Sequence, residues 1–127
     1  MDRGEVMELV NLELTFAVCK LDDISMVDFD HQFVFLSKTD DEISLVCDED
    51  FTPENAIEVE RGWKGLKISG VLDFGMVGVI AKISNLLSTA QISIFVVSTF
   101  NTDYIFLKSA KLLDGIRILR DNGYIVK

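Results

Sequence analysis

The stretch that decides the fold is ISIFVVSTFNTDYIFLK, residues 92–108. Its first part, Ile92–Ser98, is a nearly continuous run of β-branched and aromatic residues, which is typical of a central strand. Asn101 and Thr102 are turn-forming residues, and Tyr104–Lys108 is a second run of strand-forming residues. The stretch therefore predicts two antiparallel strands joined by a tight turn.

The flanking sequence predicts two helices and two more strands. Apolar residues recur every three or four positions between an expected N-cap at Asp73 and Ala90, which indicates an amphipathic helix. Ala110–Asn122 has a second such pattern, and Gly123 follows it as a helix stop. With strands at Trp63–Val71 and Tyr124–Val126, the second half is β-α-β-β-α-β, a ferredoxin-like α+β fold with an antiparallel sheet and both helices on one face. The residues of the second helix expected to point inward are Leu112, Leu113, Ile116 and Leu119.

The first half resembles a degenerate copy of the second. Strand-like runs occupy residues 12–21, 33–37, 43–47 and 57–61, and Gly62 is expected to break the chain before the next strand. An ungapped alignment at an offset of 61 places Glu42 opposite Asp103. The acidic segment 22–32 between the first two strands is too short for a full helix. We therefore expect two domains, residues 1–62 and 63–127.

The composition narrows the classes of function. The 127 residues carry a net charge of −9, which argues against a nucleic-acid partner because phosphate binding needs a basic surface. Acids are concentrated in residues 1–63 (17 acids, 4 bases), whereas residues 64–127 are basic (4 acids, 8 bases), so the halves attract each other within a chain or between two copies. No membrane span and no signal peptide are recognisable, and a cytoplasmic protein is expected.

The side chains that could carry chemistry are few. Cys19 and Cys47 lie in apolar runs and are expected to be buried free thiols. The one histidine, His31, is expected in a surface loop, so no metal site and no cofactor are predicted. The loop after residue 70 lacks the arginine that acylphosphatases of this fold need, and no grouping of Ser, His and Asp is present, so we expect no catalysis.

Two second-half motifs, GVLDFGMVGVIA (residues 70–81) and residues 92–107, resemble the C-terminal module of small bacterial tandem ACT-domain proteins. The strand and turn at 98–104 are also similar to those of the eukaryotic cytosolic arginine-sensor ACT proteins. First-half segments FAVCKLD (16–22) and TDDEISLVC (39–47) fit the same bacterial family, so that the resemblance covers about the whole chain.

The resemblance implies a regulatory protein that binds a small molecule, usually an amino acid, at an interface between ACT modules. A helix N-terminus offers free N–H groups to the ligand carboxylate, and an acidic residue in the turn suits its ammonium group. By resemblance to the arginine sensors the contacts are Met76, Val77, Gly78 and Val79 at the helix start and Thr99, Phe100 and Asp103 at the turn, and Glu42 holds the corresponding first-half position.

Each of these assignments has a structural alternative. The glycines at the helix start could serve close packing of helix on strand. Asp103 could cap its own turn, and Glu42 could belong to a solvated acidic turn. At the level of the whole protein, the alternative to a ligand sensor is a module for protein interaction or oligomerisation with no ligand. The expected partners are thus an amino acid or similar metabolite, a second copy in a homodimer or other homo-oligomer, and a protein partner.

Overall fold

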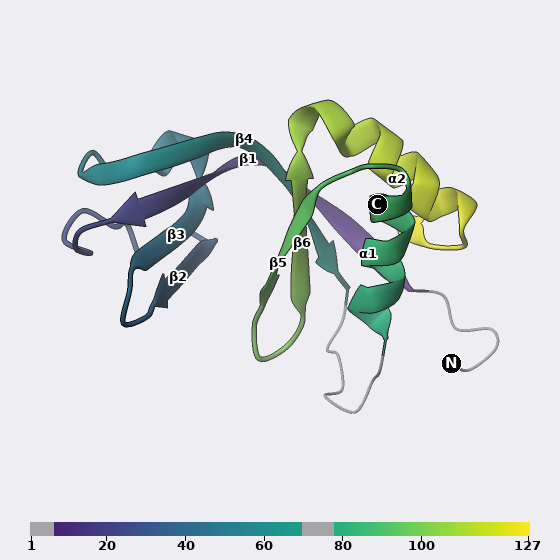
Figure 1. The fold of residues 1–127 in the computed structure, drawn as a ribbon, viewed down its shortest axis with the longest axis horizontal. Coiled ribbons are helices and arrows are strands. Elements are labelled where there is room, and N and C mark those ends of the chain that lie inside the picture. Colours follow the sequence, from purple (N-terminus) through teal and green to yellow (C-terminus); the bar gives the residue numbers. More distant parts are fainter. Residues whose placement is uncertain (1–6, 70–77) are drawn as a thin grey trace. The chain divides into compact units, whose positions relative to one another are not determined.

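The computed structural model describes residues 7–69 and 78–127, and it divides the chain into two compact units (Figure 1). Unit 2 is Leu14–Trp63, and unit 1 combines residues 1–13 with Lys64–Lys127. The strands β1 (Glu8–Leu21) and β4 (Ala56–Ile68) each pass from one unit into the other. The expected boundary at residue 62 lies one residue from the end of unit 2, whereas residues 7–13, expected with the first half, lie in unit 1.

Unit 1 has the predicted β-α-β-β-α-β order, with the N-terminal part of β1 added to its sheet. The strand order is β7-β1-β4-β6-β5, so that β5 lies at the edge and the expectation of a central strand at Ile92–Ser98 was wrong. β7 pairs with β1 in parallel, and β5 pairs with β6 antiparallel. Its further elements are α1 (Val79–Thr89), β5 (Ile94–Ser98), β6 (Asp103–Lys108), the 3-10 turn η2 (Ser109–Lys111), α2 (Leu112–Asp121) and β7 (Ile125–Val126).

The core of unit 1 lies between its sheet and its two helices. Strand residues Ile105 and Leu107 are fully buried against Ile83 and Leu87 of α1 and Leu119 of α2. Burying such side chains stabilises the fold by about 1.5–3 kcal/mol each. The α+β, ferredoxin-like architecture is therefore confirmed.

Two helix details differ from the expectation. α1 begins at Val79 with Gly78 as N-cap, not at Asp73, which lies outside the described residues. Leu113 is 80% exposed instead of inward. Leu112, Ile116 and Leu119 follow one stripe of α2, and Leu113 lies about 100° away from that stripe because each residue turns the helix by that angle.

Unit 2 is a sheet without helices. Its strand order is β2-β3-β1-β4, with β2 at Val34–Lys38 and β3 at Ile43–Asp48, and the predicted hairpin between β2 and β3 is confirmed. A short 3-10 turn, η1 (Glu49–Phe51), follows β3. All of residues 14–63 are described, and none of them is α-helical. One cluster of buried core residues in unit 2 consists of Ala17, Cys19, Leu21, Leu45 and Cys47.

The two units repeat the same hairpin at an offset of 60 residues. Val34–Lys38 corresponds to Ile94–Ser98, and Ile43–Asp48 corresponds to Asp103–Lys108, with the same register: Val34 pairs with Cys47 as Ile94 pairs with Leu107. The turns η1 and η2 match at the same offset. The degenerate copy is thus present, but the sequence alignment at 61 was wrong by one residue, which exchanges the two faces of each strand.

The expected chain break at Gly62 was also wrong, because β4 continues through it from Ala56 to Ile68. Gly62 has φ +82°, a left-handed conformation that favours glycine, and its N–H donates to Glu49 Oε1 at 3.0 Å. In β1, Glu13 has φ +62°, next to the point where that strand enters unit 2. Both shared strands therefore carry a left-handed residue within two residues of the unit boundary.

Candidate functional site

The turn between β5 and β6 is held by two threonines. The Thr99 N–H and the Thr99 hydroxyl both donate to the Thr102 carbonyl, at 2.9 and 3.1 Å. The Thr102 hydroxyl, which is buried, donates to the Ile68 carbonyl at 2.8 Å and so joins the turn to the end of β4. Phe100 lies at the tip and is 80% exposed. Thr99 is therefore a turn-stabilising residue, and Phe100 is open to solvent.

Asp103 is the first residue of β6 and pairs with Ser98. It is half-buried, and within residues 7–69 and 78–127 its carboxylate makes no hydrogen bond or ion pair. Because Thr99 and Thr102 supply the bonds that close the turn, Asp103 does not act as the cap that the structural alternative required. A half-buried carboxylate in this position can accept hydrogen bonds from a cationic ligand.

The start of α1 lies at the same end of unit 1 as the β5–β6 turn (Figure 1). Gly78 is the N-cap, with φ +82°, and it makes no side-chain capping bond. Its carbonyl accepts from the Lys82 N–H at 2.9 Å, which is the first hydrogen bond of the helix. Val79 follows as the first helical residue, so the first N–H groups of α1 and their partial positive charge begin here. Met76 and Val77, predicted as contacts, lie outside the described residues.

Glu42 belongs to unit 2, whereas the other predicted residues belong to unit 1. It ends the β2–β3 turn, where the Thr39 N–H donates to the Glu42 carbonyl at 2.9 Å and the Ser44 hydroxyl donates to Glu42 Oε1 at 3.1 Å. At the offset of 60 this turn matches the turn of Thr99 and Thr102, so Glu42 corresponds to Thr102 and Asp103 corresponds to Ile43. The expected pairing of Glu42 with Asp103 was therefore wrong.

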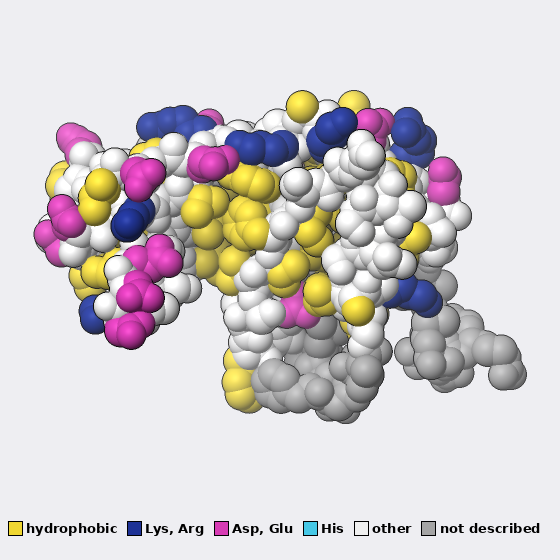
Figure 2. Space-filling view, in the orientation of Figure 1, with side chains coloured by type: hydrophobic (Ala, Val, Ile, Leu, Met, Phe, Trp, Pro, Cys, Tyr) yellow, Lys and Arg dark blue, Asp and Glu magenta, His cyan; other side chains and the backbone are white. Residues whose placement is uncertain are grey.

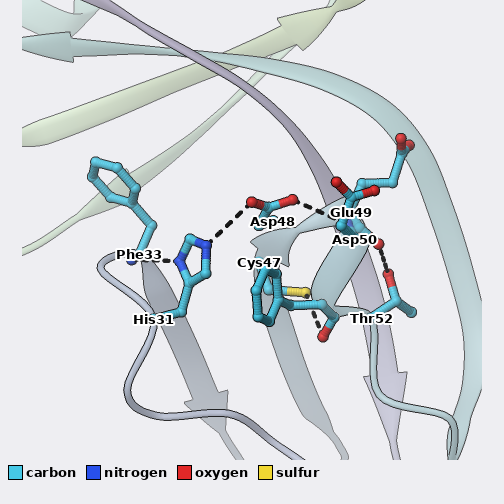
Figure 3. Close-up of polar contacts among 8 residues, drawn as sticks. His31, Phe33, Cys47, Asp48, Glu49, Asp50 and Thr52 are labelled. Atoms are coloured by element: carbon cyan, nitrogen blue, oxygen red, sulfur yellow. Dashed lines mark hydrogen bonds and ion pairs between the residues drawn. The ribbon is translucent and has the colours of Figure 1, made fainter.

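A polar cluster around His31 was missed by sequence reasoning (Figure 3). His31 Nδ1 accepts from the Phe33 N–H at 3.2 Å, which leaves the proton on Nε2, and Nε2 lies 3.1 Å from Asp48 Oδ2. The ring packs edge-on against Phe51, with centroids 4.6 Å apart. His31 is thus largely buried and fixes the segment before β2 to η1, contrary to the expected surface loop. Its partner lies 17 residues away, so no local spacing could identify it.

The two cysteines are buried free thiols, as expected. They lie on neighbouring strands, since β1 pairs Ala17 with Cys47 and Cys19 with Leu45. A hydrogen bond from Cys47 lowers the pKa of Cys19, whereas the same bond together with burial raises the pKa of Cys47. Both thiols lie inside the core of unit 2.

An open groove of about 1000 Å³ lies along α1 and the start of β5. Its lining is largely polar and includes Lys82, Ser84, Asn85, Ser88 and Gln91. None of the predicted contact residues that the structure describes lines it, and the hydroxyls of Ser84 and Ser88 already donate to backbone carbonyls. In the described part of the chain no three His, Cys, Asp or Glu side chains gather as a metal site, and no helix is long and apolar enough to cross a membrane.

Comparisons with known proteins identify both halves. A family model described as an ACT domain matches residues 58–121, and a second model, of an N-terminal domain, matches residues 15–55. A solved protein from Agobacterium tumefaciens is 30% identical, with a TM-score of 0.85 over 98% of this chain and 94% of the other. No curated protein sequence matches the chain.

More distant solved structures share the fold. The regulatory subunit of aspartate kinase from Thermus thermophilus is 10% identical, with a TM-score of 0.62 over 89% of this chain and 95% of the other. Aspartokinase III from E. coli, solved in complex with aspartate and ADP, is also 10% identical, with a TM-score of 0.62 over 91% of this chain but 32% of that enzyme. At these identities the likeness concerns the fold.

Proposed function

Because this chain belongs to the ACT domain family, we propose that it is a regulatory, non-catalytic protein that binds an amino acid or similar small metabolite at an interface between ACT modules. The fold is that of the regulatory subunit of an aspartate kinase, and another aspartokinase of this fold was solved with aspartate, which supports a ligand of this class. The proposal includes ligand contacts at the β5–β6 turn and at the start of α1, as the resemblance to the arginine sensors implies.

One observation carries the proposal: at one end of unit 1, a helix N-terminus lies with a half-buried carboxylate that has no side-chain partner among the described residues. In the described residues Asp103 makes no polar contact of its own, while Gly78 and Val79 begin α1. The carboxylate suits the ligand ammonium group, and the N–H groups of the first helical turn suit its carboxylate. Thr99 shapes the turn, and in this proposal the exposed Phe100 at the tip of the turn would cover the bound ligand.

The test is a thermal-shift screen of the purified protein against the twenty standard amino acids. A ligand at 100 times its dissociation constant adds about 2.7 kcal/mol to the free energy of unfolding, which raises the melting temperature by on the order of 10 °C for a chain of this size. We expect the shift to be lost in Asp103→Asn and kept in the matched control Asp121→Asn, at the exposed end of α2. A shift that survives Asp103→Asn would refute this site.

A second candidate function rests on the edge of the sheet. β5 ends the strand order of unit 1, so its outer backbone groups are available for pairing with another chain. A protein-interaction module without a ligand would use such an edge in a homodimer, another homo-oligomer or a complex with a protein partner. The absence of any shift across the whole panel would favour this candidate over the ligand sensor.

A further inference from the structure

Unit 2 has kept the strands of the repeat and lost its helices. At the offset of 60, Leu45 and Cys47 correspond to Ile105 and Leu107, which in unit 1 face α1 and α2. In unit 2 the segment 22–33 stands in place of the first helix, and η1 with Thr52–Asn55 stands in place of the second. The face that two helices cover in unit 1 is therefore covered in unit 2 by irregular chain.

This cover is held by packing and by hydrogen bonds. Val27 of the segment 22–33 packs on the core cluster of unit 2, and Glu49 Oε1 of η1 accepts from the Gly62 N–H at 3.0 Å. The segment 22–33 is fixed by the contact of His31 with Asp48. It is fixed again where Asn55 Nδ2 donates to Asp23 Oδ1 at 3.1 Å, so the two covering segments lie side by side.

The cover exposes large apolar side chains to solvent. Ile24, Met26 and Phe29 on the segment 22–33 are 45–55% exposed, and Phe51 on η1 is 46% exposed. Phe51 packs against the His31 ring and Asn55 bonds Asp23, so the two segments that carry these exposed side chains are neighbours. We call these four residues, with the acids beside them, the acidic apolar surface. Apolar side chains gathered in this way and rimmed by charge mark an interaction site.

The rim carries one sign of charge. Residues 14–63 contain 13 acidic and 3 basic side chains, and Figure 2 shows many Asp and Glu side chains on the surface that unit 2 forms. Four acids lie on the segment 22–33 itself, and three more flank Phe51 and Asn55. A partner for this surface must therefore be basic as well as apolar. These acids are Asp22, Asp23, Asp28, Asp30, Glu49, Asp50 and Glu54.

The same chain presents a surface of that chemistry on α2. Leu113 is 80% exposed, and Arg117 and Arg120 follow it at positions i+4 and i+7 on the same side of the helix. We call these three residues the α2 face. Arg117 Nη2 lies 3.2 Å from Asp114 Oδ1, but 67% of the Arg117 side chain is exposed. Its guanidinium therefore remains accessible to carboxylates of another molecule.

We propose that the acidic apolar surface of unit 2 binds the α2 face of a second copy of this chain. Leu113 would pack among Phe29, Met26 and Phe51, while Arg117 would pair with the surrounding acids. Arg120 donates through Nη2 to the Val126 carbonyl at 2.6 Å, so it would pair with an acid through its remaining N–H groups. The contact joins two different surfaces, so it is a head-to-tail contact in which each copy offers both halves of the interface. It is distinct from pairing at the β5 edge and needs no ligand.

The test is sedimentation velocity of the full chain without ligand, from low micromolar to submillimolar concentration. We expect concentration-dependent association that weakens on raising NaCl to about 1 M, where the screening length is about 3 Å. Phe29→Ser and Leu113→Ser should each raise the dissociation constant at least about 10-fold, since each removes a central apolar contact. Ile57→Ser is the matched control, because Ile57 is 50% exposed but lies on β4 outside this surface.

Mixing the two variants gives a stricter test. Phe29→Ser keeps an intact α2 face and Leu113→Ser keeps an intact acidic apolar surface, so a mixture of them should recover one contact and form a heterodimer. Melting temperatures within a few degrees of the parent protein exclude unfolding as the cause. A parent protein that stays monomeric, an assembly that neither substitution weakens, or a mixture that does not associate would each overturn the proposal.

Discussion

The left-handed residues near the unit boundary allow a sharp test of backbone strain. Glu13 in β1 and Gly62 in β4 both have positive φ, +62° and +82°, but one carries a side chain and the other does not. The Glu13 side chain is exposed, and a Cβ added at Gly62 would have nothing within 4 Å. The substitutions Glu13→Gly and Gly62→Ala therefore change the backbone preference with little change in packing.

The expected magnitudes follow from two opposing contributions. An L-residue in the left-handed region costs about 1–2 kcal/mol, whereas glycine loses roughly 0.5–1 kcal/mol more conformational entropy on folding. Glu13→Gly should therefore raise the free energy of unfolding by up to about 1 kcal/mol, and Gly62→Ala should lower it by a similar amount. For a chain of this length, about 1 kcal/mol corresponds to roughly 4 °C in melting temperature.

The assay is equilibrium urea unfolding of both variants beside Glu13→Ala, which shortens the side chain but keeps the strained backbone. We expect that control to change the free energy of unfolding by less than about 0.5 kcal/mol. If Gly62→Ala were neutral or stabilising, the left-handed conformation in β4 would not be needed for folding. If Glu13→Ala stabilised as much as Glu13→Gly, the side chain and not the backbone would be the source of the strain.

Further predictions concern the core and its polar contacts. His31→Ala should lower the free energy of unfolding by about 1–3 kcal/mol, because it removes the partner of Asp48 Oδ2, while Oδ1 keeps its bond from the Asp50 N–H; urea unfolding against Gln32→Ala measures the difference. Burial raises the pKa of Tyr124 in the folded chain. The stability that the neutral Tyr124 contributes should therefore be fully present below pH about 10, its pKa in the unfolded chain, and should be lost as the pH rises above that value. Tyr124→Phe should show a smaller loss between neutral and alkaline pH in the same experiment, and an equal loss would refute this cause. Gly115→Ala should destabilise by up to about 2 kcal/mol despite its better helix propensity, because its Cβ would lie 2.8 Å from Leu107 Cδ1 in the core; Leu107→Val in the same chain should recover part of the loss.

The sequence predicted most of the second half because its signals are local. The alternation and β-branched residues of 92–108 and the 3.6-residue periods on either side identified α1, β5, β6 and α2. The prediction was wrong where the position of an element depends on partners that are distant in the sequence. The Ile92–Ser98 run looked central, but its place at the edge follows from strand order, which local sequence does not contain.

The first half was harder to predict for a physical reason. With both helices lost, unit 2 is held by contacts distant in sequence, such as His31 with Asp48 and Asp23 with Asn55. The alignment of the halves erred by one residue because only apolar character is shared, and backbone hydrogen bonds of the turns are needed to fix the offset. Of the candidate site, the turn of Thr99 to Asp103 and the helix start at Gly78 could be located from motifs, whereas the correspondence of Glu42 to Thr102 required the structure.

The crossing of β1 and β4 between the units has a consequence for synthesis on the ribosome. Unit 2 is one continuous stretch, Leu14–Trp63, and can form its sheet while the second half is still being made. Unit 1 needs residues 7–13 beside β7, a pairing that joins the two ends of the chain and closes only after Val126 has emerged. Until then the N-terminal part of β1 can pair with β4 on one side but lacks β7 on its other side. A separate Trp63–Lys127 fragment would therefore form a sheet that lacks the β1 strand. Adding residues 7–13 to this fragment as a peptide should restore that strand.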